Sequence, residues 1–164
     1  ILARDTPIVL IAEPGRETEA ALRLGRIGFD YVAGYLEGGM PALEMRPDLL
    51  RRSERINAAT LAARLAAPEP PMVLDVRMPG EWQEKHIAGS VHIPLNHLRE
   101  RLQEVPRHQR LVVHCQSGYR SAIAAGLLEQ HGVTHLADLV GGFAAWDTVQ
   151  PERVTTRARP FSAE

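Results

Sequence analysis

The fold of this chain is decided by one stretch of sequence, Leu111-Val112-Val113-His114-Cys115-Gln116-Ser117-Gly118-Tyr119-Arg120-Ser121. Its apolar residues at 111–114 predict a short buried strand, and the residues at 115–118 predict a turn. A helix is expected over 121–131, where Gly132 would end it. The only thiol of the chain therefore follows the carboxyl end of a strand, which is where open α/β sheets bind their ligands.

Strands and helices alternate on both sides of this stretch. Before it we expect a helix over 58–65 capped by Asn57, a strand over 72–76, a helical turn over 81–86, a short strand over 90–93 and a helix over 95–103. After it, a strand over 136–140 leads to a closing loop at Gly141-Gly142. This alternation predicts an α/β domain over residues 54–150, with a central, mostly parallel sheet and helices on both faces.

The same order of elements occurs near the N-terminus. An apolar strand at 8–11 is followed by a helix over 17–27 that Gly28 ends, a strand over 31–36 and a closing loop at Gly38-Gly39. At a constant offset of 103 residues, Val9 falls on Val112 and Gly38-Gly39 falls on Gly141-Gly142. Co-linear matches of this kind favour a duplication. Residues 1–45 would then be a partial copy that contains only the back half of the later domain.

A 45-residue fragment buries too little surface to be stable alone. It would have to dock on the later domain, pair with a partner chain in a homodimer, or belong to an upstream half. The charge-rich composition of residues 46–55 predicts a solvated linker with a short helix around 48–53, and that of residues 151–164 predicts a loose tail. The chain begins at Ile1 with no initiator Met, and its first residues resemble neither a signal peptide nor a transit peptide. We therefore expect it to be a piece of a longer protein.

Composition excludes several classes of protein. The chain has 164 residues, and 19 Lys and Arg against 20 Asp and Glu give a net charge of −1, which leaves no basic excess for nucleic acid. Apolar runs are too short for a membrane span. A single Cys forms neither an internal disulfide nor a thiolate metal cluster, and the seven His show no ligand spacing. We therefore expect a cytoplasmic protein with no metal and no cofactor.

The turn after the strand has the features of an anion cradle. Its backbone N–H groups, the N-terminus of the following helix and the guanidinium of Arg120 would all lower the pKa of the Cys115 thiol from its usual value of about 8.5. Taken singly, Cys115 fits a buried apolar residue, Arg120 a surface ion pair and Ser121 a helix cap. Their combination with Gly118 favours a reactive thiolate in a cradle for anions.

Four ordered motifs resemble the rhodanese (thiosulfate sulfurtransferase) family over residues 54–150. The active loop of that family is similar to residues 115–121. Its Asp-Val-Arg element is similar to Asp75-Val76-Arg77, its second motif to residues 81–94, and its closing segment to residues 141–146. One departure is Lys85, where the family usually has Gly before the His-Ile pair.

The resemblance implies a persulfide mechanism without a cofactor. Cys115 would take a sulfane sulfur from thiosulfate or a persulfide donor and pass it to cyanide or a thiol. Asp75 and Arg77 would organise the loop, although a purely structural ion pair explains them equally well. The substrate-binding residues would be those of the loop, with Arg120 holding the anionic donor: Gln116, Ser117, Gly118, Tyr119, Arg120 and Ser121.

Two alternatives bear on this assignment. Related phosphatases have five residues between Cys and Arg, and this loop has four, which favours sulfur transfer. The rhodanese fold can also serve as a protein-interaction module of a larger protein. The N-terminal copy has Ala12, Glu17 and Thr18 in place of Cys, Arg and Ser, so it resembles an inactive repeat. By analogy with tandem arrangements, a metallo-β-lactamase-like persulfide dioxygenase domain would precede it.

Overall fold

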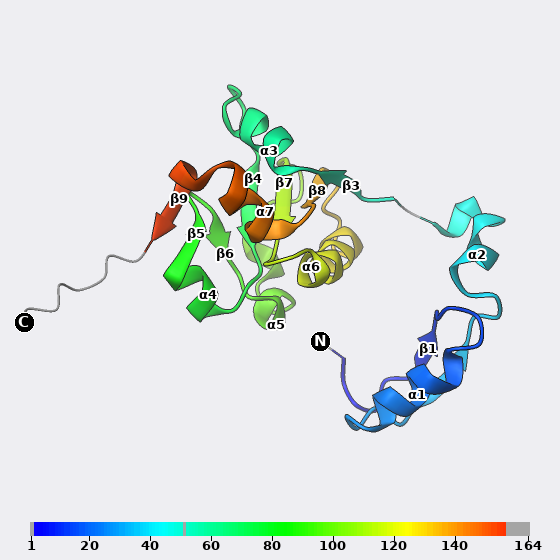
Figure 1. Ribbon diagram of the computed structural model, residues 1–164. Coiled ribbons are helices and arrows are strands. Elements are labelled where there is room, and N and C mark those ends of the chain that lie inside the picture. The colour runs from blue at the N-terminus through cyan, green and yellow to red at the C-terminus, as the bar shows by residue number, and fades with distance from the viewer. Residues whose placement is uncertain (1, 51, 157–164) are drawn as a thin grey trace, which may run out of the picture. The chain divides into compact units, whose positions relative to one another are not determined.

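The computed structural model describes residues 2–50 and 52–156, and the chain divides into two compact units (Figure 1). Unit 1 is Ile1–Arg52 and unit 2 is Ser53–Glu164. Among the residues in these described ranges, no helix is long and apolar enough to cross a membrane.

Unit 2 is built around a five-stranded sheet in which every neighbouring pair is parallel. Its order is β3-β8-β7-β4-β6. The strands are β3 (Glu54–Ile56), β4 (Met72–Asp75), β6 (Val91–His92), β7 (Leu111–His114) and β8 (Leu136–Leu139). The central strands β4, β7 and β8 are almost wholly buried, as expected for strands covered on both faces. The α/β class with a mostly parallel sheet is therefore confirmed.

Helices cover both faces of this sheet. They are α3 (Ala58–Leu65), α4 (Pro79–Glu84), α5 (Leu95–Leu98), α6 (Tyr119–Gln130) and α7 (Gly142–Val149). Successive strand residues point to opposite faces, so Leu111 and Val113 pack with α5 and α6 in one cluster. Val112 packs with α3 and α7 in the other, around the fully buried Trp146.

Two short strands form a separate antiparallel pair in unit 2. β5 (Lys85–Ile87) pairs with β9 (Val154–Thr156), with Ile87 opposite Val154. The predicted helical turn over 81–86 is thus wrong for Lys85 and His86, which are extended. The predicted loose tail over 151–164 is wrong for 151–156, where a 3₁₀ turn at Pro151–Arg153 leads into β9. Residues 157–164 of that tail lie outside the described residues.

Other boundaries also differ from the predictions. The linker expected over 46–55 ends early because residues 54–56 form β3, whose Ile56 is buried beside β8. The helix expected over 95–103 stops at Leu98 and is followed by a 3₁₀ turn at Leu102–Glu104. The short helix expected around 48–53 is a 3₁₀ turn at Pro47–Leu49.

Unit 1 contains one parallel pair of strands and two helices. They are β1 (Ile8–Leu10), α1 (Glu17–Gly25), β2 (Val32–Tyr35) and α2 (Gly39–Glu44). The closing loops predicted at Gly38-Gly39 and Gly141-Gly142 in fact begin helices, α2 and α7. In both units the first of the two glycines precedes the helix with a left-handed backbone, which a glycine adopts at little cost.

Candidate active site

The loop between β7 and α6 surrounds the sulfur of Cys115. Gly118 takes a φ of 113°, so the chain turns back and the Gly118 N–H donates to Sγ at 3.2 Å. The Ser121 hydroxyl, in the first turn of α6, lies between two loop acceptors. It donates to the Gly118 carbonyl at 3.1 Å, and it can turn to donate to the sulfur when Cys115 is ionised. Cys115 is only 1 % exposed, so its sulfur lies at the bottom of this cradle.

The cradle lowers the pKa of the Cys115 thiol. Burial acts in the opposite direction, because it penalises the thiolate. The backbone N–H groups of Ser121, Gly118 and Ser117, together with the Ser121 hydroxyl, stabilise the negative charge and outweigh the burial. The result is a pKa below the ordinary value of the thiol, and therefore a larger thiolate fraction at neutral pH.

Arg120 is bound to a carboxylate that lies on another element. Its Nη1 and Nη2 atoms donate to Oε2 and Oε1 of Glu81 at 2.6 and 2.7 Å, a bidentate pair. Glu81 also accepts the backbone N–H of Met78 at 2.9 Å, at the start of α4. The Arg120 hydrogen bonds, opposed by burial and aided by the Met78 N–H, lower the pKa of Glu81 to about 2.

Glu81 is the residue that sequence reasoning missed. The sequence places it only in a motif and a helical turn, and gives it no role at the loop. The sequence Met78-Pro79-Gly80-Glu81 has the pattern of a helix N-terminus with an acidic residue in its first turn, which could have placed this carboxylate. Nothing local connects it to Arg120, which is 39 residues away.

Asp75 and Arg77 form a buried ion pair beneath the loop. Arg77 Nη2 lies 2.7 Å from Asp75 Oδ2, and the two side chains are 2 % and 0 % exposed. Arg77 Nη1 donates to Gln116 Oε1 at 3.1 Å, and its guanidinium lies 4.0 Å above the Phe143 ring. The pair thus holds the side chain of a loop residue and does not contact the thiol.

The helix α7 supports the loop from below. The Phe143 N–H donates to the Cys115 carbonyl at 2.7 Å, and the Ala144 N–H donates to the Gln116 carbonyl at 3.1 Å. Gly142 allows this approach, because a Cβ at that position would collide with the Cys115 carbonyl oxygen. The carbonyls of the loop are therefore bound from below while its N–H groups face the sulfur.

The nearby histidines have structural contacts. His86 Nδ1 lies 2.7 Å from the Trp82 carbonyl and His92 Nε2 lies 2.9 Å from the Arg77 carbonyl, and both rings stack on Trp82. His114 is fully buried, and burial lowers its pKa. In the part of the chain that the structure describes, no group of His, Cys, Asp and Glu could hold a metal ion.

The predicted site residues thus meet in one place but differ in their surroundings. Ser117, Gly118 and Ser121 enclose the sulfur, Gln116 contacts Arg77, and Arg120 contacts Glu81. Tyr119 is 79 % exposed. A pocket of about 340 Å³ lies beside the loop, lined by Arg77, Glu81, Glu84, Lys85, Gln116 and Phe143.

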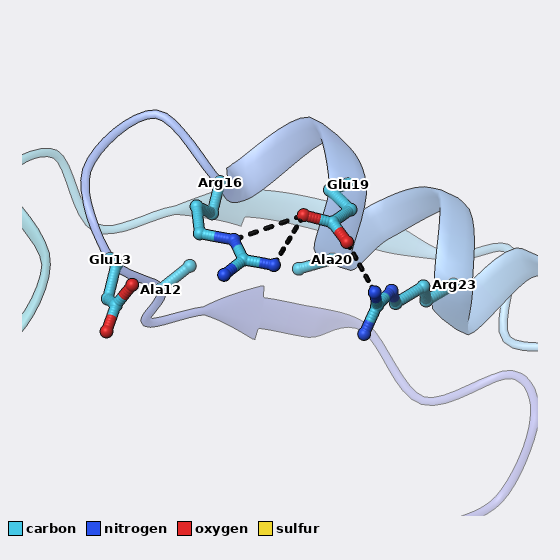
Figure 2. A pocket seen from close by; sticks show the side chains of 6 residues that line it. All are labelled: Ala12, Glu13, Arg16, Glu19, Ala20 and Arg23. Carbon is cyan, nitrogen blue, oxygen red and sulfur yellow. Dashed lines mark hydrogen bonds and ion pairs between the residues drawn. The ribbon is translucent and has the colours of Figure 1, made fainter.

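The loop between β1 and α1 of unit 1 has no thiol. Figure 2 shows its pocket of about 260 Å³, lined by Ala12, Glu13, Arg16, Glu19, Ala20 and Arg23. The Glu19 carboxylate binds both Arg16 and Arg23, so the two cations share one negative charge. The Glu17 carboxylate accepts the Gly15 N–H at 3.0 Å.

Two known sulfurtransferases are similar to this chain in sequence. A sulfurtransferase of Allochromatium vinosum is 33 % identical over 91 residues, which cover 56 % of this chain and 85 % of that protein. The thiosulfate sulfurtransferase PspE of Escherichia coli is 34 % identical over 70 residues, covering 42 % of this chain and 67 % of PspE.

A solved structure is also similar to this chain. The rhodanese-related protein of Thermoplasma volcanium superposes with a TM-score of 0.54 at 37 % identity, over 59 % of this chain and 93 % of that one. The chain spans 59 % and 40 % of the length of two further relatives from Bacillus subtilis.

Residues 57–148 match the model of the Rhodanese-like domain, and the chain belongs to that family.

Proposed function

We propose that unit 2 is a sulfurtransferase that carries sulfur on Cys115. The Cys115 thiolate attacks the outer sulfur of thiosulfate, the S–S bond of the donor breaks, and sulfite leaves with the electron pair. The persulfide anion then passes its outer sulfur to cyanide, which gives thiocyanate and restores the thiolate. No oxidant or reductant is needed, because each step exchanges one nucleophile for another.

The observation that carries this proposal is the N–H cradle around Sγ. It lowers the pKa of the attacking thiol, and the same N–H groups are oriented to stabilise the anion of a persulfide. Burial among these donors also shields a persulfide from water. The names of the sulfurtransferases of A. vinosum and E. coli support the same chemistry for this chain.

The test is formation of the persulfide and its turnover. The full chain is incubated with thiosulfate and weighed by mass spectrometry, and thiocyanate is measured after addition of cyanide. We expect the mass of one additional sulfur atom and continuous turnover, with both lost in Cys115→Ser. A folded wild-type chain that gains no sulfur and makes no thiocyanate would contradict the proposal.

A protein-interaction module is the second candidate. It is favoured by unit 1, which keeps the local fold of the loop but has Ala12 in place of the thiol. If unit 2 acts only by binding, its thiol should show an ordinary pKa of about 8.5 and no persulfide. If the rate of Cys115 alkylation instead rises with pH around a pKa below about 8.5, the proposal that unit 2 acts only by binding is excluded.

We further propose that unit 1 is the back half of an inactive rhodanese-like repeat. Gly38 and Gly141 have nearly the same backbone angles, with φ of 76° and 74°. A Cβ on Gly39 would collide with the Ala12 carbonyl oxygen, as one on Gly142 would with that of Cys115. Val9 is 65 % exposed whereas its counterpart Val112 is 1 % exposed, as expected for a copy without its front half.

A thiol placed in the unit 1 loop tests this correspondence. Ala12→Cys is made together with Cys115→Ser, so that it is the only thiol, and with Glu17→Gln, which removes the nearby carboxylate. If the loop has the geometry of a cradle, the pKa of the new thiol should lie below about 8.5. A pKa at or above that value would contradict the correspondence.

The remaining expectations stay predictions. An upstream dioxygenase-like domain is tested by the complete reading frame, which should encode metal-binding His and Asp motifs before residue 1. A homodimer is tested by sedimentation of the chain, and a cytoplasmic location by fractionation of cells. The small-molecule donor and acceptor are identified by turnover with each candidate.

A further inference from the structure

We propose that the cradle of unit 2 selects sulfur donors with a single negative charge over the dianion thiosulfate, and that Glu81 is the residue that sets this preference. The inference rests on the proposed sulfur transfer and names its substrate class. Donors of this class are thiosulfonates and organic persulfides, in which an organic group replaces one charged oxygen or the sulfonate itself.

The two cations that line the pocket, Arg77 and Lys85, are already paired with carboxylates, and so is Arg120 of the active loop. Arg77 is bound to Asp75, Lys85 is bound to Asp147, and Arg120 is bound to Glu81. Glu84 also lines the pocket and adds a fourth carboxylate. These groups therefore carry one negative charge in excess, even before the thiolate is counted.

The Glu81–Arg120 pair is the one that matters most for a donor. Arg120 is the cation of the active loop. Each of its two terminal nitrogens donates one hydrogen bond to Glu81, and its guanidinium also interacts with the Cys115 sulfur. Glu81 is held in turn by the Met78 N–H, so its carboxylate is fixed from both sides. An anionic donor that approached Arg120 would have to displace this carboxylate or accept it as a neighbour.

The repulsion grows with the charge of the donor. Coulomb energy is proportional to the product of the charges, so a carboxylate a few ångströms away penalises a dianion twice as much as a monoanion. At distances of about 6–12 Å and a dielectric constant of about 40, each unit of donor charge costs roughly three- to tenfold in association. The backbone N–H groups of the cradle contact the transferred sulfur, which both classes of donor share.

Two donors of matched shape measure this difference. Thiosulfate and methanethiosulfonate differ by one oxygen anion in place of a methyl group, and they release sulfite and methanesulfinate respectively. We expect the wild-type chain to have the higher kcat/KM with methanethiosulfonate. In Glu81→Gln the ratio of the two values should shift toward thiosulfate by about three- to tenfold.

A second readout does not depend on sulfur transfer. Iodoacetate and iodoacetamide alkylate thiolates and differ by one negative charge, and Cys115 is the only thiol that they can label in this chain. The rate ratio is compared with that of a small free thiol. Glu81→Gln should speed iodoacetate relative to iodoacetamide by about three- to tenfold.

A matched control is available at the other edge of the sheet. Glu54, at the start of β3, forms a bidentate pair with Arg64. Glu54→Gln removes the same charge and breaks the same kind of pair, far from the carboxyl ends of the strands. It should leave both ratios unchanged. Gln at position 81 can still accept the Met78 N–H, so the helix start is retained.

The results separate this inference from the proposed function. Shifts of both ratios in Glu81→Gln alone support it. An unchanged alkylation ratio, or equal losses with the two donors, would overturn it, because Glu81 would then only position Arg120. A shifted alkylation ratio with no persulfide from either donor would overturn the sulfurtransferase proposal and the donor selection with it, while Glu81 would remain the source of the local charge.

Discussion

Replacing Gly142 by Ala tests whether α7 determines the shape of the active loop. Gly142 has a φ of 58°, and an added Cβ would lie 2.8 Å from both the carbonyl carbon and the carbonyl oxygen of Gln116. It would lie closer still to the Cys115 carbonyl oxygen. All three are backbone atoms, so no side-chain rotation can relieve the collision, and either the loop or α7 has to move.

The cost can be worked from these contacts. A left-handed backbone costs a non-glycine residue about 1–2 kcal/mol. Moving α7 away weakens the hydrogen bonds from Phe143 and Ala144 to the loop, each worth about 1 kcal/mol. We therefore expect Gly142→Ala to reduce the free energy of unfolding of unit 2 by about 3–4 kcal/mol.

Urea denaturation followed by tryptophan fluorescence measures this effect. Both tryptophans, Trp82 and Trp146, lie in unit 2, so the signal reports on that unit. With a slope of about 2 kcal/mol per molar urea, the midpoint should fall by about 1.5–2 M. Gly126→Ala is the control, because that helical glycine has open space around it and should gain up to about 1 kcal/mol. A Gly142→Ala midpoint equal to that of wild type would show that α7 does not determine the shape of the loop.

Three further outcomes follow from the site. Asp75→Asn leaves the buried Arg77 without its counter-charge and should cost about 3–5 kcal/mol of unfolding free energy in urea. The pKa of Glu81 is about 2 in the folded chain, below its ordinary value, so its stabilisation is present above pH 5 and is lost as the pH falls toward 2. Because the pair is partly exposed, this loss should be about 1 kcal/mol, absent in Glu81→Gln. Ser121→Ala should raise the pKa of the Cys115 thiol, measured by alkylation against pH, whereas Ser117→Ala, which keeps its N–H group, should not.

Elements whose evidence is local could be predicted from the sequence. The strand over 111–114 and the helix over 58–65 are confirmed at the predicted residues, and Asn57 caps that helix by accepting the Thr60 N–H at 2.8 Å. In both cases the decisive residues lie within one turn or one strand. The parallel order of the sheet followed because strands and helices alternate along unit 2.

Elements whose partners are distant in sequence were missed. β3 has the charged residues Glu54 and Arg55 and only one buried side chain, so its pattern resembles a linker until β8 supplies its hydrogen bonds. β9 is extended because the backbone of β5, about 70 residues earlier, is there to pair with it. The Glu81–Arg120 pair has the same origin, since it depends on where α4 and α6 begin in space.

The two units separate what a loop needs to fold from what it needs to react. The approach of Gly142 to the Cys115 carbonyl involves backbone atoms only, and Gly39 approaches the Ala12 carbonyl in the same way although Ala12 has no reactive group. Glycine at these positions therefore predicts the shape of the loop, whatever side chain stands at its start. The thiol, its N–H donors and the charge around Arg120 decide the chemistry, and of these the charge depends on Glu81, which lies outside the loop. A rhodanese-like loop with every glycine in place can thus differ in its donor through a single carboxylate on a neighbouring helix.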